Sequence, residues 1–189
     1  MVKGHFSDQL LWRQPLFGEV SRAPTELRDW LLDSGSLTQS LQQASEGQFS
    51  VEVLSQSVQL PRLSERRALG LAPRRVALIR EVLLFGRGTP WVYARSVIPM
   101  QTLTGRLRKL RHLDSRPLGA LLFSDPTMSR EPLELACIPA NKNRTLNPKL
   151  PAHNQPIWGR RSVFKLSDKP LLVCEMFLPG FKPNEHAIK

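Results

Sequence analysis

Three charged side chains interrupt segments of the sequence that are otherwise apolar. Arg80 and Arg95 lie in two neighbouring apolar stretches, and Glu175 stands in the apolar run 171–178. Burying an unpaired charge is costly, so each of these groups must meet an opposite charge or an ionic ligand. A guanidinium that holds a carboxylate, and a carboxylate that orients a hydroxyl or moves a proton, are chemistry that such a set could perform.

The two arginines belong to a predicted β-hairpin, in which a turn at 86–88 joins strands at 74–85 and 89–99. Both faces of the first strand are largely apolar, so we expect it to be buried on both sides. If the turn closes at its centre, residues whose numbers sum to 175 lie opposite each other, which pairs Arg80 with Arg95. Like charges in opposition are destabilising unless an anion lies between or beside them.

Glu175 would share its strand face with Leu171, Val173 and Phe177. An internal ion pair between Arg80 and Glu175 would offset the cost of burying both charges, with no function implied. A bound anion beside Arg80, with Glu175 facing the other end of the same ligand, fits the pattern equally well. The sequence pattern leaves both interpretations open.

Two predicted helix starts add backbone donors that could hold the same anion. Ser36 begins one helix with a Ser-x-x-Gln capping box, and Leu37 lies in its first turn. Pro117 begins another, with Leu118 in its first turn. First-turn N–H groups lack intrahelical partners and favour anions, although water or side chains can cap them as well.

The remaining pattern indicates an α+β domain. A strand begins near Phe49, a second hairpin is expected at 162–166 and 170–178, and residues 139–156 are expected to form a long surface loop. Strands grouped in hairpins, with helices before and between them, predict a single antiparallel sheet with helices packed on it.

Composition narrows the possible functions. The 189 residues suffice for one domain, and the net charge of +11 suits nucleic acid, an acidic membrane, a small polyanionic substrate or simply solubility. No apolar stretch reaches the ~20 residues that cross a bilayer, and we expect no secretory signal and a cytoplasmic location. Metal ligation is not expected, because the cysteines and histidines are scattered: Cys137, Cys174, His5, His112, His153 and His186.

An ordered set of short segments resembles the chorismate pyruvate-lyase family, over about residues 27–180. The chain departs from the family pattern at Leu37, where methionine is common, at Ala94, where glycine is familiar, and in a longer 139–156 loop. In chain order, the matching segments are Trp30-Leu31-Leu32, Ser36-Leu37-Thr38, Ile79–Leu84, Pro90-Trp91, Arg95–Pro99, Leu103-Thr104-Gly105, Arg116–Gly119 with Leu122-Phe123, Trp158–Ser162 and Lys169–Pro179.

The resemblance implies an enzyme that cleaves chorismate to 4-hydroxybenzoate and pyruvate without metal or cofactor, the first committed step toward the ubiquinone ring. It implies one chorismate lyase-like domain over residues 1–189, a monomer, with the ligand enclosed beneath helical flaps. Arg80 would hold the ring carboxylate, assisted by the backbone N–H groups of Leu37 and Leu118. Glu175 would meet the ring oxygen at the far end.

The enolpyruvyl carboxylate of chorismate needs a further cation, for which Arg95 and Arg161 are the candidates. An alternative function is a non-catalytic sensor of a small aromatic acid, because the family fold is similar to ligand-sensing domains of some bacterial transcription regulators. No helix-turn-helix pattern precedes the predicted sheet, which favours the enzyme. Nucleic-acid binding is a third possibility, suggested by the basic segment 106–111, but no nucleic-acid motif accompanies it, and we expect neither nucleic-acid binding nor membrane insertion.

Overall fold

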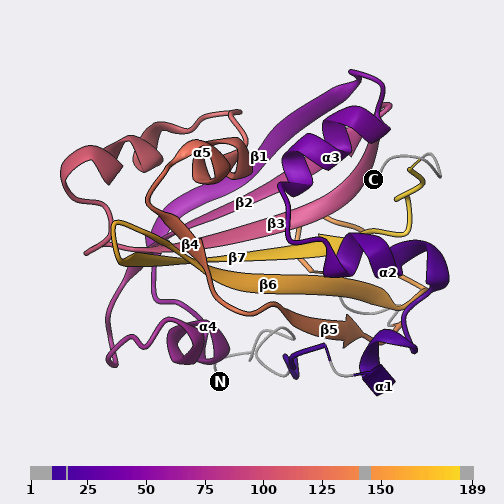
Figure 1. The fold of residues 1–189 in the computed structure, drawn as a ribbon, viewed down its shortest axis with the longest axis horizontal. Helices are drawn as coiled ribbons and strands as arrows, with labels where there is room; N and C mark the ends of the chain where they lie inside the picture. The colour runs from indigo at the N-terminus through magenta and orange to yellow at the C-terminus, as the bar shows by residue number, and fades with distance from the viewer. Residues whose placement is uncertain (1–9, 16, 141–145, 184–189) are drawn as a thin grey trace.

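The computed structural model describes residues 10–15, 17–140 and 146–183, and its centre is one antiparallel β-sheet (Figure 1). The sheet has seven strands in the order β1-β2-β3-β7-β6-β4, and β5 also pairs with β6. The last strand along the chain therefore lies in the middle of the sheet. The strands are β1 (Phe49–Gln59), β2 (Ala77–Gly86), β3 (Thr89–Pro99), β4 (Met128–Arg130), β5 (Glu134–Ile138), β6 (Ile157–Leu166) and β7 (Lys169–Phe177).

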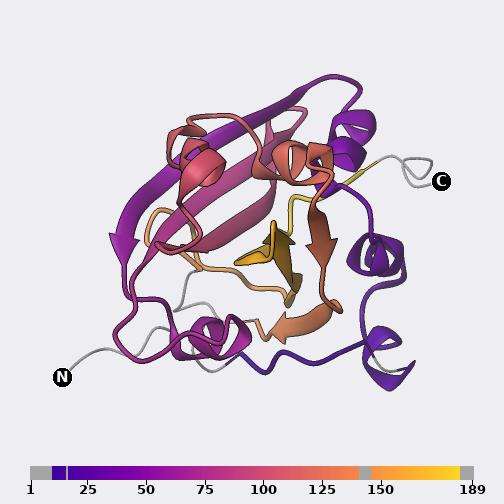
Figure 2. The same ribbon diagram turned by 60° about the vertical axis from the view of Figure 1, so that its left-hand side comes forward.

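Helices cover both faces of this twisted sheet (Figure 2). The first face carries α2, α3, η2 and α5, whose side chains join two apolar clusters with the sheet. The second face carries α4 and residues 146–157, which pack on two other clusters. The bounds are α1 (Phe17–Val20), α2 (Thr25–Leu32), α3 (Leu37–Ala44), α4 (Leu63–Ala68), the 3₁₀ helix η2 (Gly105–His112) and α5 (Leu118–Ser124).

The β2–β3 hairpin forms as predicted, but its predicted register is wrong beyond the turn. Phe85 pairs with Pro90 as expected, and then Leu84 pairs with Val92, so Trp91 is an extra residue in a β-bulge. The bulge shifts every later pair by one residue and moves the β3 side chains beyond it to the opposite face. Arg80 consequently lies opposite Ser96, and Glu81 lies opposite Arg95.

Gly86 makes this bulge possible. A Cβ atom added at Gly86 would lie 2.2 Å from the indole ring of Trp91, so a side chain there would displace the ring. Trp91 is only 2% exposed and packs in the core of the first face. The close approach of ring to backbone thus fixes the face on which each later residue of β3 lies.

Other elements agree with the sequence in part. The β6–β7 hairpin and the helix that Ser36 begins form as expected, whereas the short strands β4 and β5 were not predicted. The basic segment 106–111 lies in the 3₁₀ helix η2.

The expectation that residues 139–156 form a surface loop is wrong for part of the described segment. Leu146 and Leu150 pack under the second face, and Asn147 is buried. The Asn147 side chain donates a 3.0 Å hydrogen bond to Glu81. The segment therefore serves as part of the layer that covers the sheet.

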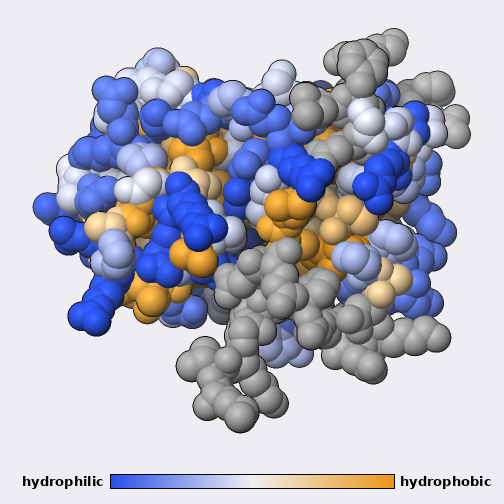
Figure 3. Space-filling view, turned by 90° about the horizontal axis from the view of Figure 1, so that it is seen from below, coloured by the Kyte–Doolittle hydropathy of each residue, from blue (hydrophilic) through white to orange (hydrophobic). Residues whose placement is uncertain are grey.

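The molecular surface is mixed in character. The side seen from below is mostly hydrophilic, with hydrophobic side chains exposed in one area near its middle and in another to the left (Figure 3). Among the described residues, no helix has the length and apolar character that a membrane crossing requires.

Candidate functional site

Arg80 is a buried cation that forms no ion pair with a carboxylate of the described residues. It is 2% exposed, and its Nη2 donates hydrogen bonds to the carbonyl oxygens of Asp114 at 2.7 Å and Arg116 at 3.2 Å. Its Nε is buried and makes no hydrogen bond with any described residue. Burial lowers the pKa of Arg80, and the charge of Asp114 opposes that shift only in part. A buried guanidinium with a free donor has the capacity to bind an anion.

The two predicted helix starts meet above the same face. Leu37 and Leu118 begin α3 and α5, and both are buried. A Cβ atom added at Gly119 would lie 2.7 Å from Oγ1 of Thr38, so the two starts touch where only glycine fits. Ser36 caps α3 by accepting a hydrogen bond from the backbone N–H of Gln39 at 3.4 Å, which is the serine half of the predicted capping box. The first-turn N–H groups thereby gather at one place.

Glu175 lies on the same face as Arg80 and is paired with a different arginine. In the register of β3 and β7 it lies opposite Ala94, and Ala94 lies opposite Val82, which shares a face with Arg80. The Glu175 Oε2 atom accepts a 2.7 Å hydrogen bond from Nε of Arg160. The alternative of a direct Arg80–Glu175 ion pair is therefore wrong, and both groups keep bonding capacity for a ligand.

Arg160 was not singled out from the sequence, although the structure makes it a central residue of this face. It is 1% exposed, and its Nη1 donates to the carbonyl oxygens of Trp30 at 2.6 Å and Asp33 at 2.7 Å. It thereby ties Glu175 to the end of α2. The alternation of Trp158, Arg160 and Ser162 on one strand face was the signal that could have revealed it.

The sheet is incompletely covered beside Glu175. Its side chain is 17% exposed and Val173 is half-buried, although β7 lies at the centre of the sheet. A side chain on a central strand keeps accessible surface only where the layer above it leaves space. The first face therefore combines a cation, grouped backbone N–H groups, a carboxylate and accessible surface between them.

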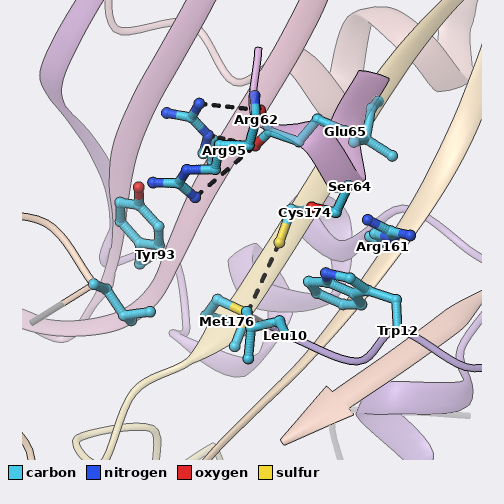
Figure 4. A pocket seen from close by; sticks show the side chains of 12 residues that line it. Leu10, Trp12, Arg62, Ser64, Glu65, Tyr93, Arg95, Arg161, Cys174 and Met176 are labelled. Atoms are coloured by element: carbon cyan, nitrogen blue, oxygen red, sulfur yellow. Dashed lines mark hydrogen bonds and ion pairs between the residues drawn. The ribbon is translucent and has the colours of Figure 1, made fainter. Parts of the chain in front are cut away.

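Arg95 and Arg161 do not join this group, because both lie on the second face (Figure 4). The Arg95 guanidinium donates to both carboxylate oxygens of Glu65, at 2.7 and 3.1 Å, and to Glu81 at 3.0 Å. Arg161 donates to Glu134 at 2.7 Å. The sheet itself separates both arginines from Arg80 and Glu175.

The second face encloses a small cavity of about 30 Å³ among these arginines, large enough for a water molecule or two (Figure 4). Cys174 lines it, and burial raises the pKa of this thiol to about 12. A thiol that stays protonated is a poor nucleophile. The charges of Arg95, Glu65 and Glu81 in this cluster are paired with one another.

The Arg95–Glu65 pair gives a prediction about stability. Burial raises the pKa of Glu65, but the hydrogen bonds and charge of Arg95 outweigh that effect and hold it below its ordinary value of 4.5. Stability from this carboxylate is thus fully present above pH 4.5 and is lost as the pH falls through the lower folded-state pKa. We expect Glu65→Gln to lower the free energy of unfolding by about 3 kcal/mol at neutral pH.

Urea unfolding between pH 3 and 7 measures both effects, and Glu26→Gln on the exposed side of α2 is the matched control. The Glu65 variant should lose less stability on acidification than the parent. Equal acid sensitivity in the two proteins would contradict the assignment.

No group of three or more histidine, cysteine, aspartate or glutamate side chains suited to a metal ion occurs among the described residues. His5 and His186 lie outside them.

Solved structures with this fold include ligand-binding domains of bacterial transcription regulators. The ligand-binding domain of a putative GntR-family regulator from Bordetella bronchiseptica has a TM-score of 0.51 at 17% identity, covering 70% of this chain and 84% of its own. The C-terminal domain of the histidine utilization repressor from Pseudomonas syringae has a TM-score of 0.52 at 11% identity, covering 71% and 94%. These similarities concern the fold alone.

Proteins with similar sequences identify the family more specifically than the fold does. The chorismate lyase family model matches residues 6–184. The probable chorismate pyruvate-lyase of Marinobacter nauticus is 43% identical over 152 residues, covering 80% of this chain and 76% of the relative. That of Azoarcus sp. (strain BH72) is 45% identical over 171 residues, covering 84% and 86%. The chain belongs to the chorismate lyase family, as the resemblance in its sequence predicted.

Proposed function

We propose that this chain is a chorismate pyruvate-lyase, which splits chorismate into 4-hydroxybenzoate and pyruvate. The observation that carries the proposal is the buried Arg80 guanidinium on the same face as Glu175. Within the described part of the chain, its Nε makes no hydrogen bond and the group forms no ion pair with a carboxylate. The family membership and the names of the relatives support the choice of substrate.

In the proposed complex, Arg80 holds the ring carboxylate through Nε. The first-turn N–H groups of Leu37 and Leu118 donate to the same carboxylate. The ring lies over the accessible surface near Val173, and its C4 hydroxyl donates a hydrogen bond to Glu175. Fixing a substrate in this way can supply about 7–11 kcal/mol of a reaction barrier.

The chemistry that follows is an elimination. The C3–O bond breaks and C4 loses its hydrogen, so the ring becomes aromatic and 4-hydroxybenzoate forms. The enolpyruvyl methylene gains a hydrogen and becomes the methyl group of pyruvate. Arg160 holds the Glu175 side chain in place, and its free oxygen orients the C4 hydroxyl. The hydrogen moves either through Glu175 or directly to the methylene.

The proposal extends to the cellular role. It includes a monomeric, cytoplasmic protein that works without metal or cofactor and supplies the ring of ubiquinone. The net charge of +11 fits a dianionic substrate, because a positively charged protein attracts a dianion electrostatically. Added salt screens this attraction.

The test is to incubate the pure protein, after treatment with EDTA, with chorismate and to quantify both products. We expect 4-hydroxybenzoate and pyruvate in equimolar amounts, and inhibition by added 4-hydroxybenzoate, because a covered aromatic product leaves slowly. Binding of 4-hydroxybenzoate without any turnover would refute the lyase and favour the alternative, a sensor of small aromatic acids.

A further inference from the structure

Arg130 reaches the candidate site from the edge of the sheet. It lies on β4 opposite Phe164, and its guanidinium stacks on that ring with 5.1 Å between the guanidinium carbon and the ring centroid. Its Nε donates to Oγ of Ser162 at 3.0 Å, and its Nη1 donates to the carbonyl oxygen of Ser34 at 2.8 Å. Nη2 makes no hydrogen bond with any described residue.

The register of the sheet places this head group in line with Arg80. Ser162 lies opposite Val173, Val173 lies opposite Ser96, and Ser96 lies opposite Arg80. Arg80 and Ser162 are therefore three strands apart on one face, or about 14 Å between strand axes. The accessible part of β7 lies between the two arginines. A ring that carries two carboxylates is the class of ligand that cations on either side of this surface would hold.

The charges near Arg130 are not balanced. Burial and the neighbouring Arg160 lower the pKa of Arg130, and Glu175 and Asp33 only partly oppose this. Arg160 already bonds to Glu175, and no ion pair joins Arg130 to a carboxylate among the described residues. A second anion beside Arg130 would relieve the repulsion between the two guanidinium groups.

We propose that Arg130 binds the enolpyruvyl carboxylate of chorismate through Nη2, and so distinguishes the dianionic substrate from the monoanionic product 4-hydroxybenzoate. This rests on the proposed function for the identity of the ligand. Arg130 thus takes the role for which Arg95 and Arg161 were the candidates from the sequence. Both of those arginines lie on the other face of the sheet. Once the C3–O bond has broken, the carboxylate at Arg130 belongs to pyruvate and no longer helps to hold the aromatic ring.

Calorimetry with two ligands that do not react tests the proposal. The dianion is 3-(1-carboxyvinyloxy)benzoate, which carries the enolpyruvyl ether on a ring that is already aromatic, and the monoanion is 4-hydroxybenzoate. Losing a hydrogen bond to a charged group should make Arg130→Gln bind the dianion about 10- to 100-fold more weakly. Its affinity for 4-hydroxybenzoate should change by less than about threefold.

Two further variants distinguish a direct contact between Arg130 and the ligand from a general effect of the protein's positive charge. Arg108→Gln removes the same charge from the exposed side of η2 and should leave both affinities unchanged. Arg130→Lys keeps the charge without the forked geometry and should bind the dianion with intermediate affinity. Thermal unfolding shows whether Arg130→Gln folds. If it does not, Ser162→Ala, which removes the partner of Nε, should weaken dianion binding alone.

Equal losses for the two ligands, or no loss for either, would overturn the proposal. The proposal would also be overturned if the parent protein bound the dianion with no higher affinity than benzoate. These measurements need no turnover, so an absence of lyase activity would refute the proposed function while the binding comparison still decided the role of Arg130.

Discussion

Replacing Arg80 with methionine is expected to lower kcat/KM for chorismate by about 100- to 1000-fold. The variant loses a charged donor to the ring carboxylate, and most of the loss should be in binding, so affinity for 4-hydroxybenzoate should fall as well. Steady-state kinetics and calorimetry measure the two effects. The loss should be larger than for any exposed arginine, because the Arg80 guanidinium is buried.

The main control for this variant is its folded state. Arg80 also donates to the carbonyl oxygens of Asp114 and Arg116, so methionine will cost some stability. Circular dichroism and thermal unfolding show whether the variant is folded at the assay temperature. Arg108→Met is the matched exposed variant, and a folded Arg80→Met with the kcat/KM of the parent would exclude Arg80 from substrate binding.

Replacing Glu175 with glutamine is expected to lower kcat by about 100- to 1000-fold while KM changes only a few-fold. The substitution keeps the shape of the side chain and removes the negative charge that orients the C4 hydroxyl. Its amide also pairs poorly with Arg160. Single-turnover measurements separate the chemical step from the release of product.

A residue of β5 provides a close control for Glu175. Glu134 on β5 accepts a 2.7 Å hydrogen bond from Nε of Arg161, the same contact that Glu175 makes with Arg160, but on the second face. Glu134→Gln should therefore change stability in a similar way and leave kcat unchanged. If both variants lost the same activity, the effect of Glu175 would be structural.

Much of this site can be predicted from the sequence, because patterns over a few neighbouring residues determine several of its elements. Alternation places Glu175 with Leu171, Val173 and Phe177, and the register of the sheet confirms that face. The serine cap predicts where α3 begins, and Pro117 precedes α5. The apolar strand around Arg80 is buried on both sides as expected.

The parts that the sequence did not reveal depend on distant contacts. The bulge at Trp91 places Arg95 on the opposite face from Arg80, and only the packing of its ring against Gly86 decides this. Arg160 acquires its role from the carbonyl groups of Trp30 and Asp33, about 130 positions earlier in the chain. Side-chain periodicity contains no information about such partners.

The central position of β7 has a consequence for biosynthesis. Until this strand has left the ribosome, β3 and β6 both present unpaired edges, and the sheet exists as two separate halves. Strand β7 must insert between them, so the β3–β7 pairs that join the halves form late and over long sequence separations. The carboxylate of Glu175 arrives with that strand, so a nascent chain that stalls before it would lack both the seam of the sheet and the acidic half of its site.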